Sequence, residues 1–293
     1  MDRKANWFDV ANTCFMVVLI AITFLPFMHV AAQSLSGNGP VMRGEVSIWP
    51  LEWSILSYQK VLSDGEVLQS YANTLLYTTV GTAINIALTA VTAYALASKH
   101  MPLRRIFTFM ITFTMMFSGG MIPSYLIVNR LGFIDKIWAM VIPGAINTWN
   151  LLVMRTFFMS VPENLTEAAM VDGAGELRVF WQIYIPLSMA SLMAITLFYA
   201  VGHWNSYFHA LIYLNSPAKY PLQIILRKIV IQGIVSLEEF SGDAALGTNV
   251  SFNQMTQNIK YTVIMVAVLP ILIVYPFVQK YFVKGVMIGA IKG

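Results

Sequence analysis

A short segment of this chain carries residues that could hold a partner protein. Residues 167–186 read EAAMVDGAGELRVFWQIYIP, with three carboxylates, of which Glu167 and Asp172 come first, in a stretch that lies between long apolar runs. Carboxylates can serve as anionic contacts for a partner, and the small side chains of Ala168 and Ala169 allow close backbone approach. These residue types favour a docking element, with an ordinary capped surface loop as the alternative.

Motifs for catalysis, metal binding and nucleotide binding are missing from the sequence. It contains no G-x-x-x-x-G-K-[ST] phosphate loop, and the GAG at 173–175 is not a dinucleotide fingerprint. No group of His, Cys, Asp and Glu has metal-ligand spacing, and no serine lies in a nucleophile elbow. We therefore expect no catalytic residue, no metal and no cofactor bound by this chain.

Several polar residues interrupt runs that are apolar enough to lie in a membrane. Polar groups are costly there, so those that occur can mark a substrate pathway. Hydrogen bonding between helices is the alternative role for such side chains. The candidates are Asn73, Asn85, Asn147, Asn150, His203 and Asn205.

The segment FSGGMIP contains residues that interrupt a helix. Gly119, Gly120 and Pro123 are predicted to break or kink the apolar run around them. A gate is one interpretation of this break. A close helix crossing and a simple kink are the alternatives.

The elements that position these residues are predicted to be membrane-spanning helices. Of the 293 residues, 57% are hydrophobic and only 11% are charged, against roughly 25% in an ordinary soluble domain. A bilayer core about 30 Å thick needs roughly 20 apolar residues in a helix. The sequence thus predicts an all-α membrane protein with one transmembrane domain, residues 1–293, and six spans: 10–33, 70–98, 106–129, 137–155, 184–210 and 261–280.

Basic residues indicate which side of the membrane each connection faces. Six helices place both termini on one side, and the short connection between the second and third spans carries Lys99, Arg104 and Arg105. Because short cytoplasmic connections are rich in Lys and Arg, we expect both termini and residues 160–185 in the cytoplasm. Residues 211–260 would form an outer loop, whose segment YPLQIILRKIVIQGIVSL is predicted as an outer-face amphipathic helix, with a seventh span as the alternative.

The cytoplasmic connection should contain two helices. Ser160 and Glu163 have the spacing of a capping box, which predicts a helix that begins there and continues to about Val171. The following DGAG tolerates the tight backbone that ends this helix. A second helix is expected to open at Glu176 and to run until Pro186 marks the entry to the fifth span.

The connection resembles a signature of known transport proteins. Its order of residues is similar to the cytoplasmic loop of permease subunits in binding-protein-dependent ABC importers, on Glu167, Ala168, Ala169, Asp172, Gly173, Ile183, Pro186 and Leu187. Other stretches resemble the carbohydrate-uptake branch, and most closely its subgroup for complex oligosaccharides, which includes a permease of the alginate importer. These stretches are MFSGGMIPSYLIVNRLG, NTWNLLVMRTFF, GHWNSYFHALIYL and QKYFVKGVMIGAIKG.

The resemblance implies a type I ABC importer permease with six transmembrane helices in the inner membrane. Its loop would be a coupling helix seated in a separate ATPase subunit, and the C-terminal tail would also reach the ATPase pair. On this basis ATPase coupling is assigned to Glu167, Ala168, Ala169, Asp172, Gly173 and Gly293. The implied partners are a second permease subunit, two ATP-binding subunits holding ATP and Mg, a periplasmic or extracellular sugar-binding protein, an oligosaccharide and membrane lipid.

The resemblance also suggests what passes through the chain. The expected cargo is an alginate-like acidic oligosaccharide, with another complex oligosaccharide as the alternative. Sugar rings could stack on Trp138, Trp149 or Trp204, for which anchoring at the membrane interface is the alternative role. The predicted pathway residues are Asn73, Asn147, Asn150, His203, Trp204 and Asn205.

Other classes of function make distinct demands on the sequence. An ion-coupled secondary transporter would need a carboxylate pair inside the membrane, whereas all 14 Asp and Glu lie outside the six predicted spans. A membrane scaffold or receptor without transport is a further alternative. Nucleic acid is not expected as a partner, because the net charge of +4 comes without a basic face interleaved with aromatic residues.

Overall fold

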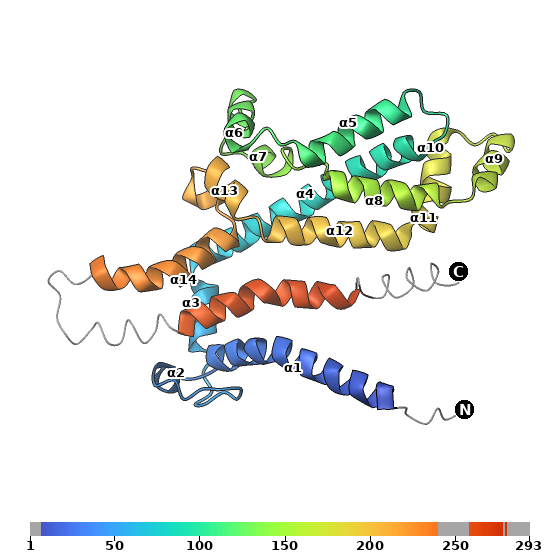
Figure 1. Ribbon diagram of the computed structural model, residues 1–293. Coiled ribbons are helices and arrows are strands. Elements are labelled where there is room, and N and C mark those ends of the chain that lie inside the picture. Colours follow the sequence, from blue (N-terminus) through green and yellow to red (C-terminus); the bar gives the residue numbers. More distant parts are fainter. Residues whose placement is uncertain (1–6, 240–257, 278, 280–293) are drawn as a thin grey trace. The chain divides into compact units, whose positions relative to one another are not determined.

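The computed structural model describes residues 7–239, 258–277 and 279, and all statements below concern these residues. Their secondary structure is helical, without a strand, which confirms the predicted all-α class. The chain divides into two compact units, residues 1–68 with 225–270 and residues 69–224 with 271–293 (Figure 1). Gly293 and most of the predicted outer loop beyond Glu239 lie outside the described residues.

In the first unit, polar side chains hold a connecting segment against the end of a long helix. His29 Nδ1 is 2.6 Å from the Ser47 carbonyl oxygen, and Gln33 Nε2 donates to the Val46 carbonyl at 3.2 Å. The elements of this unit are α1 (Trp7–Ser34), α2 (Asn38–Met42), α3 (Leu56–Ser63), the start of α4 (Gly65–Ala97), most of α14 (Leu222–Glu239) and the first part of a last helix, Asn258–Phe277.

The second unit holds the rest of α4 and a series of shorter helices. They are α5 (Arg104–Met116), α6 (Met121–Arg130), α7 (Ile137–Val141), α8 (Thr148–Met159), α9 (Glu163–Val171), α10 (Glu176–Val179), a π-helical turn (Phe180–Tyr184), α11 (Ile185–Leu187), α12 (Met189–Trp204), α13 (Phe208–Tyr213) and a 3₁₀ turn (Pro217–Lys219). α8 packs against both α5 and α12. Figure 1 shows these three helices beside α4.

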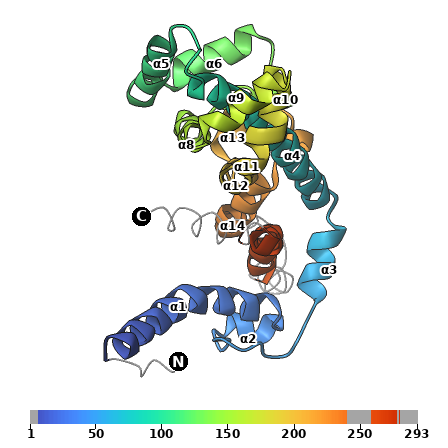
Figure 2. The ribbon, with the colours of Figure 1, turned by 90° about the vertical axis from the view of Figure 1, so that its right-hand side faces the viewer.

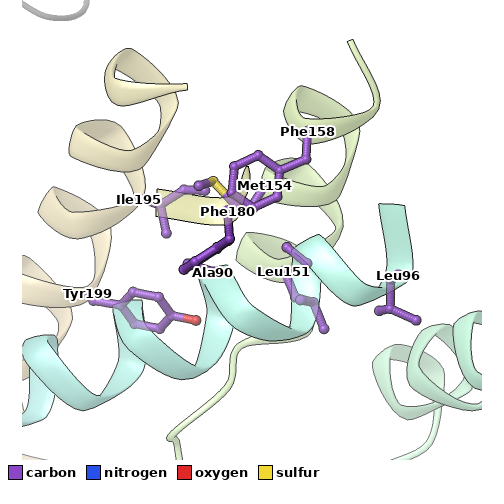
Figure 3. Close-up of a cluster of buried hydrophobic side chains, with 9 residues drawn as sticks. Ala90, Leu96, Leu151, Met154, Phe158, Phe180, Ile195 and Tyr199 are labelled. Atoms are coloured by element: carbon purple, nitrogen blue, oxygen red, sulfur yellow. The ribbon is translucent and has the colours of Figure 1, made fainter. Parts of the chain in front are cut away.

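The largest core of the second unit lies among α4, α8, the π-helical turn and α12. Its buried side chains are Ala90, Ala93, Leu96, Leu151, Met154, Phe158, Phe180, Ile195 and Tyr199 (Figure 3). Close van der Waals packing of this kind is what holds helices together in a bilayer, where burial from water supplies no driving force between them. A hydrogen bond of 3.0 Å from Arg155 Nε to the Leu96 carbonyl also joins α8 to the end of α4.

Three described helices are long and apolar enough to cross a bilayer, namely α1, α4 and Asn258–Phe277. Two further segments pass the same test as bent pairs, α5 with α6 and Glu176–Leu187 with α12. That these segments, and six in all, cross the membrane stays a prediction. The segment predicted as an outer-face amphipathic helix is the helix α14, and its placement on the outer face likewise stays a prediction.

The predicted break at Gly119 and Gly120 is present and sharp. Gly120 adopts a φ of +84°, and α5 and α6 meet at 117°. Such a φ is readily adopted only by glycine. Pro123 lies in the first turn of α6, where its missing N–H costs no helical hydrogen bond.

The prediction of a continuous fourth span over 137–155 is wrong. Helix α7 ends at Val141 and α8 begins only at Thr148, because Pro143 and Gly144 between them disfavour a helix. The break leaves carbonyl groups without helical partners, and Asn85 of α4 satisfies two of them. Its Nδ2 donates to the Gly144 carbonyl at 2.6 Å and to the Ala145 carbonyl at 3.0 Å.

The prediction of a continuous fifth span over 184–210 is also wrong. The helix runs through Pro186, which was expected to mark its boundary, and the interruption falls at Ser188, with φ −105° and ψ +18°. Glu176–Leu187 and α12 therefore meet at 84°. The second helix ends at Trp204, and α13 is separate from it.

Asp135 clamps two connections of the second unit together. It lies between α6 and α7, and its carboxylate accepts hydrogen bonds from the Ser216 hydroxyl at 2.6 Å and the Lys219 ammonium at 2.7 Å. The Lys219 hydrogen bond, followed by those from Ser216 and Asn215, holds the pKa of this carboxyl well below its ordinary value.

The Asn85→Leu variant tests how much the helix break at residues 142–147 relies on side-chain hydrogen bonds for its stability. Loss of the amide leaves the Gly144 and Ala145 carbonyls unpaired, so we expect the free energy of unfolding to fall by about 2–4 kcal/mol. Equilibrium unfolding in detergent measures this change. Asn129→Leu, at an exposed position of α6, is the control and should be near neutral; equal effects of the two variants would contradict this role of Asn85.

Asp135→Asn should destabilise the protein only where the wild-type carboxyl is ionised. Because the folded pKa is depressed, the contribution is present above the unfolded pKa of about 3.9 and disappears as the pH falls through the folded pKa. The difference in unfolding free energy between wild type and variant should thus be constant near neutral pH and shrink below about pH 4. A difference in unfolding free energy that does not change with pH would rule out a stabilising role of the ionised Asp135 carboxylate.

Candidate functional site

The predicted docking element is a short helix followed by a tight turn. Helix α9 runs from Glu163 to Val171, and Gly173 after it has a φ of +80°. Hydrogen bonds of 3.0 Å from the Gly173 N–H to Met170 and 2.9 Å from the Ala174 N–H to Ala169 close the turn. The predicted end of the helix and its glycine turn are confirmed.

The predicted capping box is wrong. Ser160 still belongs to the end of α8, where its hydroxyl donates to the Phe157 carbonyl at 2.7 Å. Glu163 instead pairs with Lys99, which follows α4, and Glu176 at the start of α10 accepts a hydrogen bond from Tyr94 of α4. The first residue of α9 and the first residue of α10 are therefore both tied to the end of α4.

The element made of α9, the Gly173 turn and α10, here called the knob, presents apolar side chains to its surroundings. Val171 is 88% exposed and Leu177 is 78% exposed. Figure 2 shows α9 and α10 foremost, at one end of the second unit. Ala168 and Asp172 are exposed as well, whereas Ala169 is half-buried.

Glu167 faces a cleft beside the knob. The cleft has a volume of about 330 Å³, and Lys99, His100 and Arg104 line it together with Glu163 and Glu167. Basic residues thus line the same cleft as the carboxylates of α9, and Lys99 pairs directly with Glu163. The knob thus combines exposed apolar side chains with a neighbouring cleft that is lined by charged residues, which is suited to docking.

A second hollow lies at the break between α7 and α8. It has a volume of about 280 Å³ and is lined by Asn85, Ala139, Met140, Pro143, Gly144, Asn147, Asn150, Phe198, Tyr199, Gly202, His203, Ser206 and His209. Three of the six predicted pathway residues, Asn147, Asn150 and His203, are among them. We call this hollow the polar cavity.

Hydrogen bonds fix the walls of the polar cavity. The Tyr199 hydroxyl accepts from the Asn147 N–H at 3.0 Å and lies 2.7 Å from the Thr89 hydroxyl. Because Asn85 gives its Nδ2 hydrogens to two carbonyls, its Oδ1 must be the acceptor for His203 Nε2 at 2.8 Å. His203 therefore carries a hydrogen on Nε2.

Gly81 gives His203 the space to reach Asn85. A Cβ atom on Gly81 would lie 2.5 Å from His203 Nε2, closer than real Cβ contacts allow. The three side chains Asn85, His203 and Tyr199 consequently join α4, the break before α8 and α12. Sequence reasoning identified Asn85 and His203 as polar candidates but did not identify Gly81 or Tyr199.

The other predicted pathway residues have partners away from the polar cavity. Asn73 donates to the Ala218 carbonyl at 2.8 Å and to the Tyr220 carbonyl at 3.1 Å. Trp204 is buried, with its ring edge-on to Tyr71 at 5.7 Å between centroids. Asn205 donates from Nδ2 to the Val201 carbonyl at 3.0 Å, which satisfies the end of α12.

The sequence analysis also missed two further polar residues of the polar cavity. Ser206 follows α12, and His209 lies in α13. His209 is an ionisable residue inside a predicted span. The high cost of a polar group in a membrane, which pointed to His203, could have pointed to His209 as well. The hydroxyl of Ser206 carries no such signal, because serine is common in membrane helices.

Comparisons with known proteins agree with these features. Residues 85–288 match the family described as "Binding-protein-dependent transport system inner membrane component". Protein LplC of Bacillus subtilis (strain 168) is 42% identical over 291 residues, which cover 99% of this chain and 97% of that protein.

Two further proteins are similar over almost the whole chain. The polygalacturonan/rhamnogalacturonan transport system permease protein YtcP of Bacillus subtilis (strain 168) is 39% identical, covering 99% of this chain and 100% of that protein. A solved structure of a bacterial ABC transporter involved in the import of the acidic polysaccharide alginate contains a chain with a TM-score of 0.84 and 32% identity, covering 96% of this chain and 99% of that one. The resemblance found in the sequence is confirmed, and the protein belongs to the family of binding-protein-dependent transport system inner membrane components, the permeases of ABC importers.

Proposed function

We propose that this chain is the permease subunit of an ATP-driven importer that moves an acidic, alginate-like oligosaccharide from a binding protein into the cytoplasm. The observation that carries the proposal is similarity over nearly the full chain to a polygalacturonan/rhamnogalacturonan permease and to a chain of an alginate importer. The polysaccharides named for these two relatives share sugar units that bear carboxylates.

The importer would contain a second permease subunit, two ATP-binding subunits and a sugar-binding protein outside the cell. ATP and Mg would bind in the ATP-binding subunits, since this sequence has no phosphate loop. Both termini and the knob would face the cytoplasm, in agreement with the basic residues Lys99, Arg104 and Arg105 near it.

The knob would be the element that receives movement from an ATP-binding subunit. Its exposed Val171 and Leu177 supply an apolar surface, and Ala168 and Asp172 are exposed beside them. The ties from Glu163 to Lys99 and from Glu176 to Tyr94 would transmit a displacement of the knob to α4. α4 in turn shapes the polar cavity through Asn85.

The polar cavity would lie on the path of the cargo, with Asn147, Asn150 and His203 in its wall. The 117° break at Gly119, Gly120 and Pro123 would act as a gate. Alternation between inward and outward states would be selected by ATP and by the loaded binding protein.

Val171→Lys should separate the permease from its ATP-binding subunits. A lysine at the end of α9 is compatible with the helix, because cations are favourable at a helix C-terminus, but it places a charge in the apolar contact. We expect co-purification of the ATP-binding subunits to fall about tenfold, equivalent to 1.4 kcal/mol of binding free energy. Leu131→Lys, an exposed apolar position after α6, is the matched control; unchanged co-purification with Val171→Lys would refute docking through the knob.

A panel of oligosaccharides tests the cargo. The chain is reconstituted in vesicles with its partner subunits, and ATP hydrolysis is measured with acidic and neutral oligosaccharides, each with its binding protein. Acidic oligosaccharides should stimulate hydrolysis most. Stimulation by neutral sugars alone would exclude the acidic cargo, and no stimulation by any sugar would exclude carbohydrate import.

A further inference from the structure

The polar cavity contains polar groups that have no partner. Asn150 is only 7% exposed, and its side-chain amide forms no hydrogen bond within the described part of the chain. The buried hydroxyl oxygen of Ser206 has no partner among the described residues either. Buried polar groups are nearly always hydrogen-bonded, so an almost buried amide without a partner among the described residues, beside the unpartnered Ser206 hydroxyl, indicates a site for a polar ligand.

The cavity also has the electrostatic character of an anion site. No Asp or Glu is among its lining residues, whose polar members are Asn, Ser, Tyr and His. Asn147 is the N-cap of α8, a helix of 12 residues, and both Asn147 and Asn150 of its first turn line the cavity. The amino end of a helix carries a partial positive charge and favours an anion.

The donors that remain in the cavity suit a carboxylate. Asn85 is fully used by two carbonyls and His203, so it cannot bind a ligand without breaking the wall. The amide of Asn150 and the hydroxyl of Ser206 can both donate. Phe198 and Tyr199 add aromatic surface beside them.

The volume of the cavity limits what it can hold. About 280 Å³ is at the lower limit of ordinary small-molecule sites, which begin near 300 Å³. That space can hold a single sugar ring. We propose that the polar cavity is a subsite for one carboxylate-bearing sugar unit, in which Asn150 and Ser206 contact the ligand; the proposal rests on the function proposed above.

A pair of variants at Asn150 separates charge recognition from simple loss of a hydrogen bond. Leucine and aspartate have the same number of side-chain heavy atoms as asparagine, and Asn150→Leu and Asn150→Asp both remove the amide donor, but only Asp adds a negative charge. The complete importer is reconstituted in vesicles, and uptake of a short uronate oligosaccharide is measured. We expect Asn150→Asp to import about tenfold more slowly than Asn150→Leu, because a buried like charge opposes the carboxylate.

The same comparison is repeated at Ser206, with Ser206→Asp and Ser206→Val. This second pair keeps the test decisive if a charge at position 150 prevents assembly. Asn129→Asp makes the same chemical change at an exposed position of α6 and should leave uptake unchanged. Assembly is followed by co-purification of the ATP-binding subunits, which a change confined to the cavity should not alter.

The outcomes are distinguishable. If wild type imports no oligosaccharide, the proposed function fails. If wild type imports the uronate and the Asp and Leu variants import it equally, whether impaired or not, the cavity does not recognise the carboxylate and the subsite is overturned. A selective loss in the Asp variants, absent in Asn129→Asp, supports the subsite.

Discussion

The second unit depends on one constraint, which is that backbone N–H and C=O groups in apolar surroundings need hydrogen-bond partners. A bilayer offers no water to pair with a free carbonyl, so a helix that breaks there needs a partner from the protein. The break between α7 and α8 frees the carbonyls of Gly144 and Ala145, and the Asn85 amide donates to both. Tyr199 accepts from the Asn147 N–H in the same break. These bonds fasten α4, α8 and α12 together at one place.

The break also determines where the two candidate functional regions lie. It creates the polar cavity and leaves the amino end of α8 beside it. Twelve residues later, or about 18 Å at 1.5 Å per residue, α8 ends and the chain enters the knob. A single packed helix therefore connects the cavity to the surface proposed for ATPase docking. Leu151, Met154 and Phe158 pack this helix into the core with residues of α4 and α12.

Features set by local residues could be predicted from the sequence. The end of α9 followed from DGAG, because Gly173 can adopt a positive φ, and the break at Gly120 followed from the same property. The fourth span was wrong as a continuous helix, since counting apolar residues does not detect an interruption whose carbonyls are satisfied by a distant side chain. The fifth was wrong as a continuous helix because the apolar run also hides the interruption at Ser188. Asn85 lies 59 residues before Gly144 in the chain. The capping box failed because α8 extends as far as Met159 and uses Ser160 at its own end.

Contact between the knob and an ATP-binding subunit is the central claim, and site-directed crosslinking measures it most directly. Cys14 is the chain's one cysteine, so Cys14→Ser provides a background in which Val171→Cys can be labelled with a photoactivatable crosslinker. In the assembled importer, light should join this position to the ATP-binding subunit, and Leu131→Cys should give no such product. A transporting complex that yields no crosslink from position 171 would contradict the account.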